Sequence, residues 1–249
     1  MQTQFAPEDS RCEAAGGVSS PDQLDWPRIN AELDARGWAL TGPLLDAAAC
    51  AALAGAYDDD ALYRSRVVMA RHGFGRGEYR YFAYPLAPVV QGLRQGLYPP
   101  LAQAANRWMD RLGEARRFPA DLEALTRRCH AAGQTRPTPL ILRYGPGDFN
   151  CLHQDLYGEE VFPLQAACLL DEPGRDFEGG EFVIVEQIPR QQSRPQVVPL
   201  RKGEGVIFAV RERPATGARG VHRRILRHGV SEVRAGSRHT LGIIFHDAA

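Results

Sequence analysis

The chain has 249 residues, a formal net charge of zero at pH 7 and a hydrophobic fraction of 44%. These values are typical of a globular domain with a buried core, and the sequence contains no apolar run of about 18 residues, the length that a membrane-spanning helix needs. Five cysteines are scattered through the sequence without a CxxC motif. This usage favours reduced thiols in a cytoplasmic protein over a disulfide framework or a zinc site.

The first elements are predicted from their capping residues. We expect residues 1–22 to form a disordered polar leader. They are not expected to be a secretory signal, because they lack a basic region followed by an apolar core. The segment 24–37 predicts a helix, since Asp25 can cap its first turn and Gly37 can end it. A short strand is expected at 38–40.

Most of the next hundred residues predict helices. Helices are expected at 44–57, 89–111 and 121–132, and a strand is expected at 78–84, where aromatic and polar residues alternate. The helix at 89–111 contains the pair Pro99-Pro100. Because proline removes a backbone donor, we expect this helix to be broken there.

The pattern changes from about residue 140. Short apolar runs then alternate with turns rich in Gly, Pro and Asp, which is typical of an antiparallel sandwich or barrel. We therefore expect a mainly β fold with a helical N-terminal region. The helical region would span 23–135 and pack on the outside of a β core that spans 136–249.

The residues with unusual chemistry lie in this second half. His153 and Asp155 are two residues apart in "NCLHQDLYGEE". If the segment is a strand, both side chains point to the same face and can hold one metal ion. A histidine from another strand would complete a triad of two histidines and one carboxylate, which leaves open positions and suits Fe(II). The alternative is a polar strand edge without a metal.

His228 is the expected third ligand. It begins a strand-like run in "LRHGVSEVRAGSRHTLGIIFH", and Arg238 follows ten residues later, after the turn signal "RAGS". We expect a hairpin that returns Arg238 to the same cavity, where its guanidinium could bind a carboxylate with two hydrogen bonds. The spacing favours His228 over His222, which we interpret as a surface or loop histidine. We expect His239 and His246 to be structural or exposed.

These residues together resemble the signature of the Fe(II)/2-oxoglutarate-dependent dioxygenases, which consists of HxD, a distal histidine and a basic residue. Two glycine-containing segments, "FEGGEF" and "PLRKGEGVIF", are similar to strand-turn segments of that family. The resemblance implies a jelly-roll (double-stranded β-helix) core, Fe(II) held by the triad, and 2-oxoglutarate bound by Arg238. In the prolyl-hydroxylase branch the basic residue is often lysine.

A second resemblance covers "RYGPGDFNCLHQD" and is to the AlkB-like oxidative demethylases. The shared features are the Arg-Tyr and Pro-Gly pairs, the step from Tyr144 to His153 and the HQD triplet. The resemblance implies that the Tyr144 hydroxyl contacts 2-oxoglutarate. An asparagine of that family is replaced here by Leu142, so one cosubstrate contact is missing or replaced. The spacing from His228 to Arg238 is shorter than in that family and fits the prolyl-hydroxylase pattern.

From about residue 140 onward the chain resembles bacterial 2OG-Fe(II) oxygenases that are predicted to act on damaged, methylated bases. This implies an enzyme that uses O2, Fe(II) and 2-oxoglutarate, with ascorbate helpful in vitro, to demethylate alkylated nucleobases in DNA or RNA. One alternative is a hydroxylase of a prolyl or other protein residue, or of a small molecule. Another is a jelly-roll module that binds without turnover. No membrane partner is expected.

Three residues are candidates for substrate contact, namely Arg76, Tyr79 and Tyr157. The first two belong to "RHGFGRGEYR", which could form a lid that stacks a base or an ordinary turn before a strand. The run 211–227 is rich in arginine, in a chain with one lysine. We interpret it as a solvated loop, and the alternative is a rim that binds phosphates. Cys151 is interpreted as a residue packed in a strand.

Overall fold

The structure is a computed structural model that describes residues 20–188, 190–218 and 220–249. Most of the expected leader at 1–22, and Arg219 of the arginine-rich run, lie outside these residues. The α-helices are α1 (Trp26–Arg36), α2 (Ala47–Gly55), α3 (Pro88–Leu112) and α4 (Leu122–Ala131). The 3-10 helices are η1 (Pro21–Gln23), η2 (Ala56–Asp58), η3 (Asp60–Leu62) and η4 (Met69–Arg71). None of the described helices is long and apolar enough to cross a membrane.

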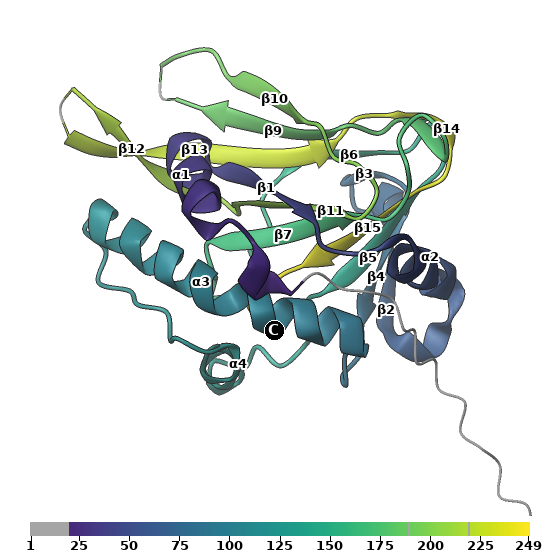
Figure 1. The fold of residues 1–249 in the computed structure, drawn as a ribbon, viewed down its shortest axis with the longest axis horizontal. Coiled ribbons are helices and arrows are strands. Elements are labelled where there is room, and N and C mark those ends of the chain that lie inside the picture. The colour runs from purple at the N-terminus through teal and green to yellow at the C-terminus, as the bar shows by residue number, and fades with distance from the viewer. Residues whose placement is uncertain (1–19, 189, 219) are drawn as a thin grey trace, which may run out of the picture.

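The strands form two facing sheets and a short ribbon (Figure 1). They are β1 (Trp38–Pro43), β2 (Tyr63–Val68), β3 (Gly75–Arg76), β4 (Glu78–Phe82), β5 (Leu140–Tyr144), β6 (Phe149–His153), β7 (Leu164–Leu169), β8 (Phe177–Gly179), β9 (Phe182–Gln187), β10 (Arg194–Val198), β11 (Glu204–Ala209), β12 (Glu212–Gly217), β13 (Gly220–Val230), β14 (Val233–Gly236) and β15 (Arg238–Ile243).

The order of the strands is that of a jelly roll. The seven-stranded sheet has the order β1-β11-β7-β15-β5-β4-β2, and the six-stranded sheet has the order β10-β9-β13-β6-β3, with β12 paired to β13. Strands β14 and β8 form the ribbon. Neighbouring strands such as β15 and β5, or β13 and β9, are antiparallel. The prediction of a mainly β, jelly-roll fold is therefore confirmed.

The core lies between the two sheets. All six residues of β7 are buried, so this strand has apolar contacts on both of its faces. Phe182 of the six-stranded sheet and Phe208 of the seven-stranded sheet meet with ring centroids 5.1 Å apart. Both rings also contact His228, at 5.9 and 4.7 Å. The apolar core therefore supports one of the chemically unusual residues directly.

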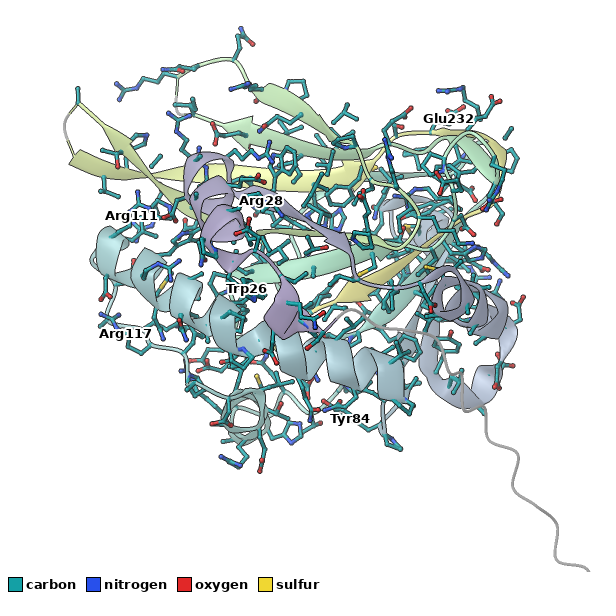
Figure 2. The ribbon with its side chains drawn as sticks, viewed as in Figure 1. Trp26, Arg28, Tyr84, Arg111, Arg117 and Glu232 are labelled. Atoms are coloured by element: carbon teal, nitrogen blue, oxygen red, sulfur yellow. The ribbon has the colours of Figure 1, made fainter. Side chains whose placement is uncertain are left out.

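The region expected to be helical, 23–135, also contributes strands. β1, β2 and β4 extend the seven-stranded sheet, and β3 pairs with β6 in the other sheet. In Figure 2 the side chain of Trp26 marks the start of α1, where its indole nitrogen donates to the carbonyl of Pro21 at 2.9 Å. Because β1 to β4 belong to the same two sheets as the later strands, each sheet contains strands from both sides of residue 135.

Helix α3 runs alongside the outer face of the seven-stranded sheet (Figure 1), and it continues through Pro99 and Pro100. The predicted break is therefore wrong. Leu97 and Leu101 are fully buried on the side of the helix that faces the protein. Carbonyl groups that lose their donors, such as that of the exposed Gln95, lie where water can pair them.

A buried ion pair fixes α3 to the last residues of the chain. Arg94 and Asp247 are 1% and 0% exposed, and a guanidinium nitrogen of Arg94 lies 2.7 Å from a carboxylate oxygen of Asp247. The hydroxyl of Tyr84, labelled in Figure 2, accepts from Arg94 at 2.8 Å and donates to Asp247 at 2.9 Å. Every charge of this cluster has a partner, as burial requires.

Candidate metal centre

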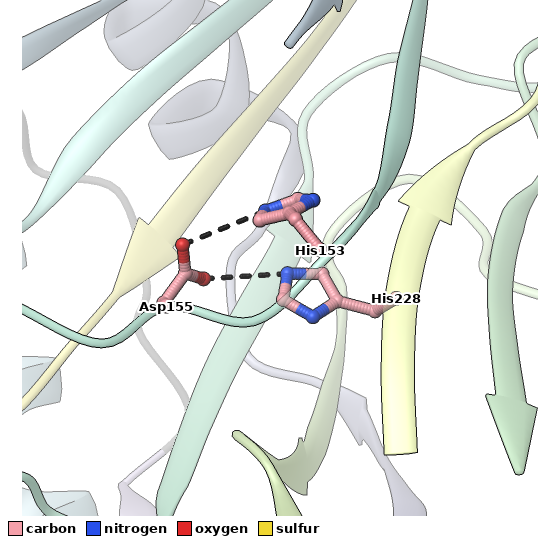
Figure 3. Close-up of side chains that lie close together, drawn as sticks. All are labelled: His153, Asp155 and His228. Carbon is pink, nitrogen blue, oxygen red and sulfur yellow. Dashed lines mark ion pairs between the residues drawn. The ribbon is translucent and has the colours of Figure 1, made fainter. Parts of the chain in front are cut away.

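His153, Asp155 and His228 converge on one point between the sheets (Figure 3). His153 ends β6, and His228 lies opposite it in the register of β13. One potential ligand atom from each of the three residues lies within 4.8 Å of the others. The Nε2 atom of His153 is 3.5 Å from one oxygen of Asp155, and Nε2 of His228 is 3.3 Å from the other.

The expectation that His153 and Asp155 share a strand is wrong. β6 ends at His153, and Asp155 lies in the segment that follows. The side chain of Gln154 donates to the carbonyl of Leu226 at 2.8 Å, and this contact fixes the chain as it leaves β6. Asp155 therefore reaches the triad from a loop.

The pKa shifts of the three residues reflect their mutual contacts. Burial lowers the pKa of His153, but a hydrogen bond and the charge of Asp155 outweigh it, so the net pKa of His153 is raised. Burial raises the pKa of Asp155, but hydrogen bonds and charge from His153 and His228 outweigh it, so the net pKa lies well below its usual range. Burial, with the charge of His153, lowers the pKa of His228. A hydrogen bond of 2.8 Å joins Nδ1 of His153 to the carbonyl of Cys151, which requires a proton on Nδ1 and leaves Nε2 as the ring nitrogen that faces Asp155.

Arg238 faces the same cavity from the opposite sheet. The predicted hairpin is wrong, because β13 belongs to the six-stranded sheet, β15 belongs to the seven-stranded sheet, and β14 lies between them in sequence. Arg238 is 1% exposed, and Gly180 permits its position: a Cβ at Gly180 would lie 2.8 Å from the Arg238 side chain. This close approach explains Gly180 of "FEGGEF", while a Cβ at Gly179 would clash with the carbonyl oxygen of Glu232.

The guanidinium of Arg238 is buried without a carboxylate partner among the described residues. One of its terminal nitrogens donates to the hydroxyl of Thr240 at 2.6 Å, while its Nε atom is buried and has no partner among those residues. Burial lowers the pKa of Arg238. Tyr144 is the cross-strand neighbour of Arg238, and its hydroxyl accepts a hydrogen bond of 3.3 Å from Asn150. Such a site favours an incoming anion.

A cavity of about 330 Å³ joins the triad to Arg238 and Tyr144. Tyr79 and Tyr157 also line it, and their contact with a substrate stays a prediction. Arg76 does not line this cavity and lies at a separate surface hollow. Cys151 lines the mouth of the cavity and is exposed, so it is not packed in the way expected. The cavity opens to solvent beside β6, where the side chains of Cys151 and Leu152 are exposed.

Comparison with known proteins connects this geometry to an enzyme family. The sequence model of a family described as "Oxygenase, catalysing oxidative methylation of damaged DNA" matches residues 77–248. The chain belongs to this oxygenase family. It is also 49% identical over 168 residues to an uncharacterised protein of Mycobacterium tuberculosis (strain CDC 1551 / Oshkosh), a match that covers 68% of this chain and 72% of the relative.

Two solved structures share the fold of the oxygenase. One is an oxidoreductase of the 2OG-Fe(II) oxygenase family from Burkholderia pseudomallei, with a TM-score of 0.50, 18% identity, and coverage of 91% of this chain and 94% of the other. The other is a prolyl hydroxylase from Trichoplax adhaerens in complex with a peptide fragment of hypoxia inducible factor, with a TM-score of 0.51, 12% identity and 89% coverage of both chains. These two likenesses show the fold expected of the 2OG-Fe(II) oxygenases, and the family match shows that the chain is an oxygenase.

The described group of potential metal ligands does not include His222, His239 or His246. His222 pairs with Ala215 in the β12–β13 hairpin. His239 contacts a carboxylate oxygen of Asp171 at 2.9 Å. His246 is fully buried, and its Nδ1 accepts from the backbone of Phe162 at 3.2 Å.

The arginine-rich run of the oxygenase forms the β12–β13 hairpin and not a loop. Arg213 and Arg224 both pair with the buried Glu186, at 2.7 and 2.6 Å. Arg223 pairs with Glu212 at 3.1 Å and also with Glu114, so three carboxylates face the three arginines. These three arginines are neutralised by carboxylates, which leaves less positive charge for phosphates than the sequence suggests.

Two polar residues of the site were missed in the sequence. Gln165 of β7 donates to Asp155 at 2.7 Å, and Asn150 of β6 donates to the hydroxyl of Tyr144. Gln165 interrupts the apolar run "FPLQAACLL", and an uncharged polar residue in a buried strand is a usable signal. Asn150 offers no such signal, since its role depends on the register of β6.

Proposed function

We propose that this oxygenase is an Fe(II)- and 2-oxoglutarate-dependent dioxygenase that oxidatively demethylates alkylated nucleobases in DNA. The proposal is supported by one continuous cavity. This cavity contains the triad and the Arg238 guanidinium, which has no carboxylate partner among the described residues, and its mouth is apolar. The description of the matched family, which names damaged DNA, supports the choice of substrate.

The three donor residues fit Fe(II). Nε2 of His153, Nε2 of His228 and one oxygen of Asp155 would hold the ion, and a triad of this kind leaves coordination positions open. Iron and 2-oxoglutarate, when bound, supply the oxidation of a substrate C–H bond by O2, with conversion of 2-oxoglutarate into succinate and CO2. On an N-methyl group the hydroxylated product releases formaldehyde and leaves the unmethylated base.

Arg238 is proposed to bind the distal carboxylate of 2-oxoglutarate. A carboxylate would stabilise the buried charge of Arg238 more than a neutral partner would, because hydrogen bonds between two charged groups are about twice as strong as neutral ones. Tyr144 accepts from Asn150 and so keeps its own proton free to donate to the same carboxylate. Asn150 therefore orients the Tyr144 hydroxyl for this contact.

The mouth of the cavity is proposed to receive the base. Phe74, Leu152 and Leu156 line it and are 48%, 44% and 44% exposed. Phe74 also stacks on His72, with ring centroids 5.3 Å apart. Stacking on an aromatic side chain is worth about 1–3 kcal/mol per base and requires no particular base sequence. Phe74 is accordingly proposed as the residue that stacks on the substrate base.

The test of this function follows two products. The purified chain is incubated with Fe(II), ascorbate, 2-oxoglutarate and a single-stranded oligonucleotide that carries N-methylated bases. The same oligonucleotide without methyl groups is the control. We expect formaldehyde, and an oligonucleotide lighter by one CH2 unit, only with the methylated strand and not with His153→Ala. If succinate forms at the same rate with either strand and no formaldehyde appears, the nucleic-acid substrate is refuted.

The main alternative is hydroxylation of a protein residue or a small molecule. The ten-residue step from His228 to Arg238 favours it, because this spacing fits the prolyl-hydroxylase pattern. It predicts a product that is heavier by one oxygen and no formaldehyde. A non-catalytic module would bind metal and 2-oxoglutarate without forming succinate under any condition.

A further inference from the structure

Both oxygens of the Asp155 carboxylate receive a hydrogen bond from a neutral donor. The hydroxyl of Tyr157 donates to one oxygen at 2.6 Å, and the amide nitrogen of Gln165 donates to the other at 2.7 Å. Asp155 and Gln165 are 8% and 3% exposed, so water competes little for these bonds. A flipped amide of Gln165 would set oxygen against oxygen, and the observed orientation is therefore the favourable one.

Each donor is itself held in place. The ring of Tyr157 makes an edge contact with Tyr81 at 6.3 Å and a tilted contact with His246 at 6.1 Å. The carbonyl of Tyr157 accepts from the side chain of Gln134 at 3.1 Å. Gln165 belongs to the fully buried strand β7. Tyr157 therefore cannot move away from Asp155 without breaking other contacts, and Gln165 extends from a strand whose backbone is paired in the sheet.

We infer that Tyr157 and Gln165 are positioning residues that fix the Asp155 carboxylate for metal binding. The inference rests on the proposed function, because it takes Asp155 as a ligand. A carboxylate on a loop can rotate, and its ordering would cost free energy when the ion binds. Two donors remove that freedom, and they disfavour coordination through both oxygens, so positions stay open for 2-oxoglutarate and O2. This role of Tyr157 differs from the substrate contact expected from the sequence.

The test measures the affinity of the metal-free chain for Co(II) by calorimetry, and the geometry of the site by the visible absorption of bound Co(II). Tyr157→Phe keeps the ring contacts and removes the donor, and Gln165→Met keeps the length and removes the amide. We expect each variant to bind Co(II) about 10- to 100-fold more weakly, as is typical for residues that orient metal ligands, and to show a changed spectrum. Tyr98→Phe is the matched control, since it removes a buried hydroxyl that donates to the carbonyl of Pro119 and does not line the cavity.

The outcomes separate this inference from the proposed function. If Tyr157→Phe and Gln165→Met bind Co(II) with wild-type affinity and spectrum, while His153→Ala does not bind, the positioning role is refuted and the metal site stands. If His153→Ala also binds like the wild type, the metal site itself fails. The unfolding midpoints of the metal-free variants, compared with that of Tyr98→Phe, show whether a loss of affinity reflects a damaged fold.

Discussion

Replacing Arg238 by methionine has two opposite effects if the residue binds 2-oxoglutarate. Removing one partner of a buried, hydrogen-bonded charge pair costs about 2–5 kcal/mol. Arg238 is 1% exposed, so solvent screens the interaction little. Since each 1.4 kcal/mol is a factor of ten, KM for 2-oxoglutarate should rise about 30-fold to several-thousand-fold.

Without 2-oxoglutarate the same change should not destabilise the protein. Arg238→Met removes a buried charge that has no carboxylate partner among the described residues. The free energy of unfolding should rise by about 1 kcal/mol, which is about 2–4 °C in the melting temperature of a chain of this size. Methionine also fills the space beside Gly180.

The assays are succinate formation over a range of 2-oxoglutarate concentrations, and thermal unfolding of the protein without 2-oxoglutarate. Arg234→Met, a change at an exposed arginine of β14, is the control and should alter neither quantity. An unchanged KM would refute the role of Arg238 in binding 2-oxoglutarate. A melting temperature several degrees below that of the wild type would show that Arg238 stabilises the fold itself.

Three further predictions concern the core and the mouth of the cavity. Asp247→Asn leaves the buried charge of Arg94 unpaired and should lower the free energy of unfolding by about 3–5 kcal/mol in urea titrations; a loss under 1 kcal/mol contradicts this. Burial lowers the pKa of His246 to about 4. The unfolded chain, with a histidine pKa of about 6.5, therefore binds more protons, and stability should fall as the pH drops from 6.5 towards 4. His246→Asn keeps an acceptor for Phe162 and should flatten this dependence, whereas equal slopes for both proteins contradict the assignment. Phe74→Ala should raise KM for a methylated oligonucleotide about 5- to 150-fold, as loss of one stacked base implies; an unchanged KM excludes stacking on Phe74.

The parts of the fold that depend on neighbouring residues were predictable. Asp25 caps α1 as expected, because its side chain accepts a hydrogen bond from the backbone of Arg28. Asp46 and Asp121 cap α2 and α4 in the same way. Such a bond requires only a suitable side chain at the right position, so its signal lies within four residues of sequence. The same holds for the alternation that predicted strand β4.

The parts that depend on distant residues were not predictable. β3 is only two residues long and exists because it pairs with β6. α3 continues through two prolines because buried side chains on either side of them hold the helix against the protein. Tertiary packing overrides a local preference in both cases.

The candidate site shows the same division. The spacing of His153, Asp155, His228 and Arg238 identified them before their geometry was known, because a metal triad needs particular residue types. Their arrangement was predicted less well: Asp155 lies after its strand, and Arg238 comes from the opposite sheet. Residue type indicated the chemistry, while strand register and sheet assignment, which involve distant residues, determined the geometry.

The most direct test of the account is succinate formation from 2-oxoglutarate by three proteins under the same conditions. These are the wild type, His228→Ala and His222→Ala, each supplied with Fe(II), ascorbate and 2-oxoglutarate. The account predicts that the wild type and His222→Ala form succinate at similar rates, because His222 lies in the β12–β13 hairpin, and that His228→Ala forms none. Equal succinate formation by wild type and His228→Ala would contradict the assignment of the metal centre.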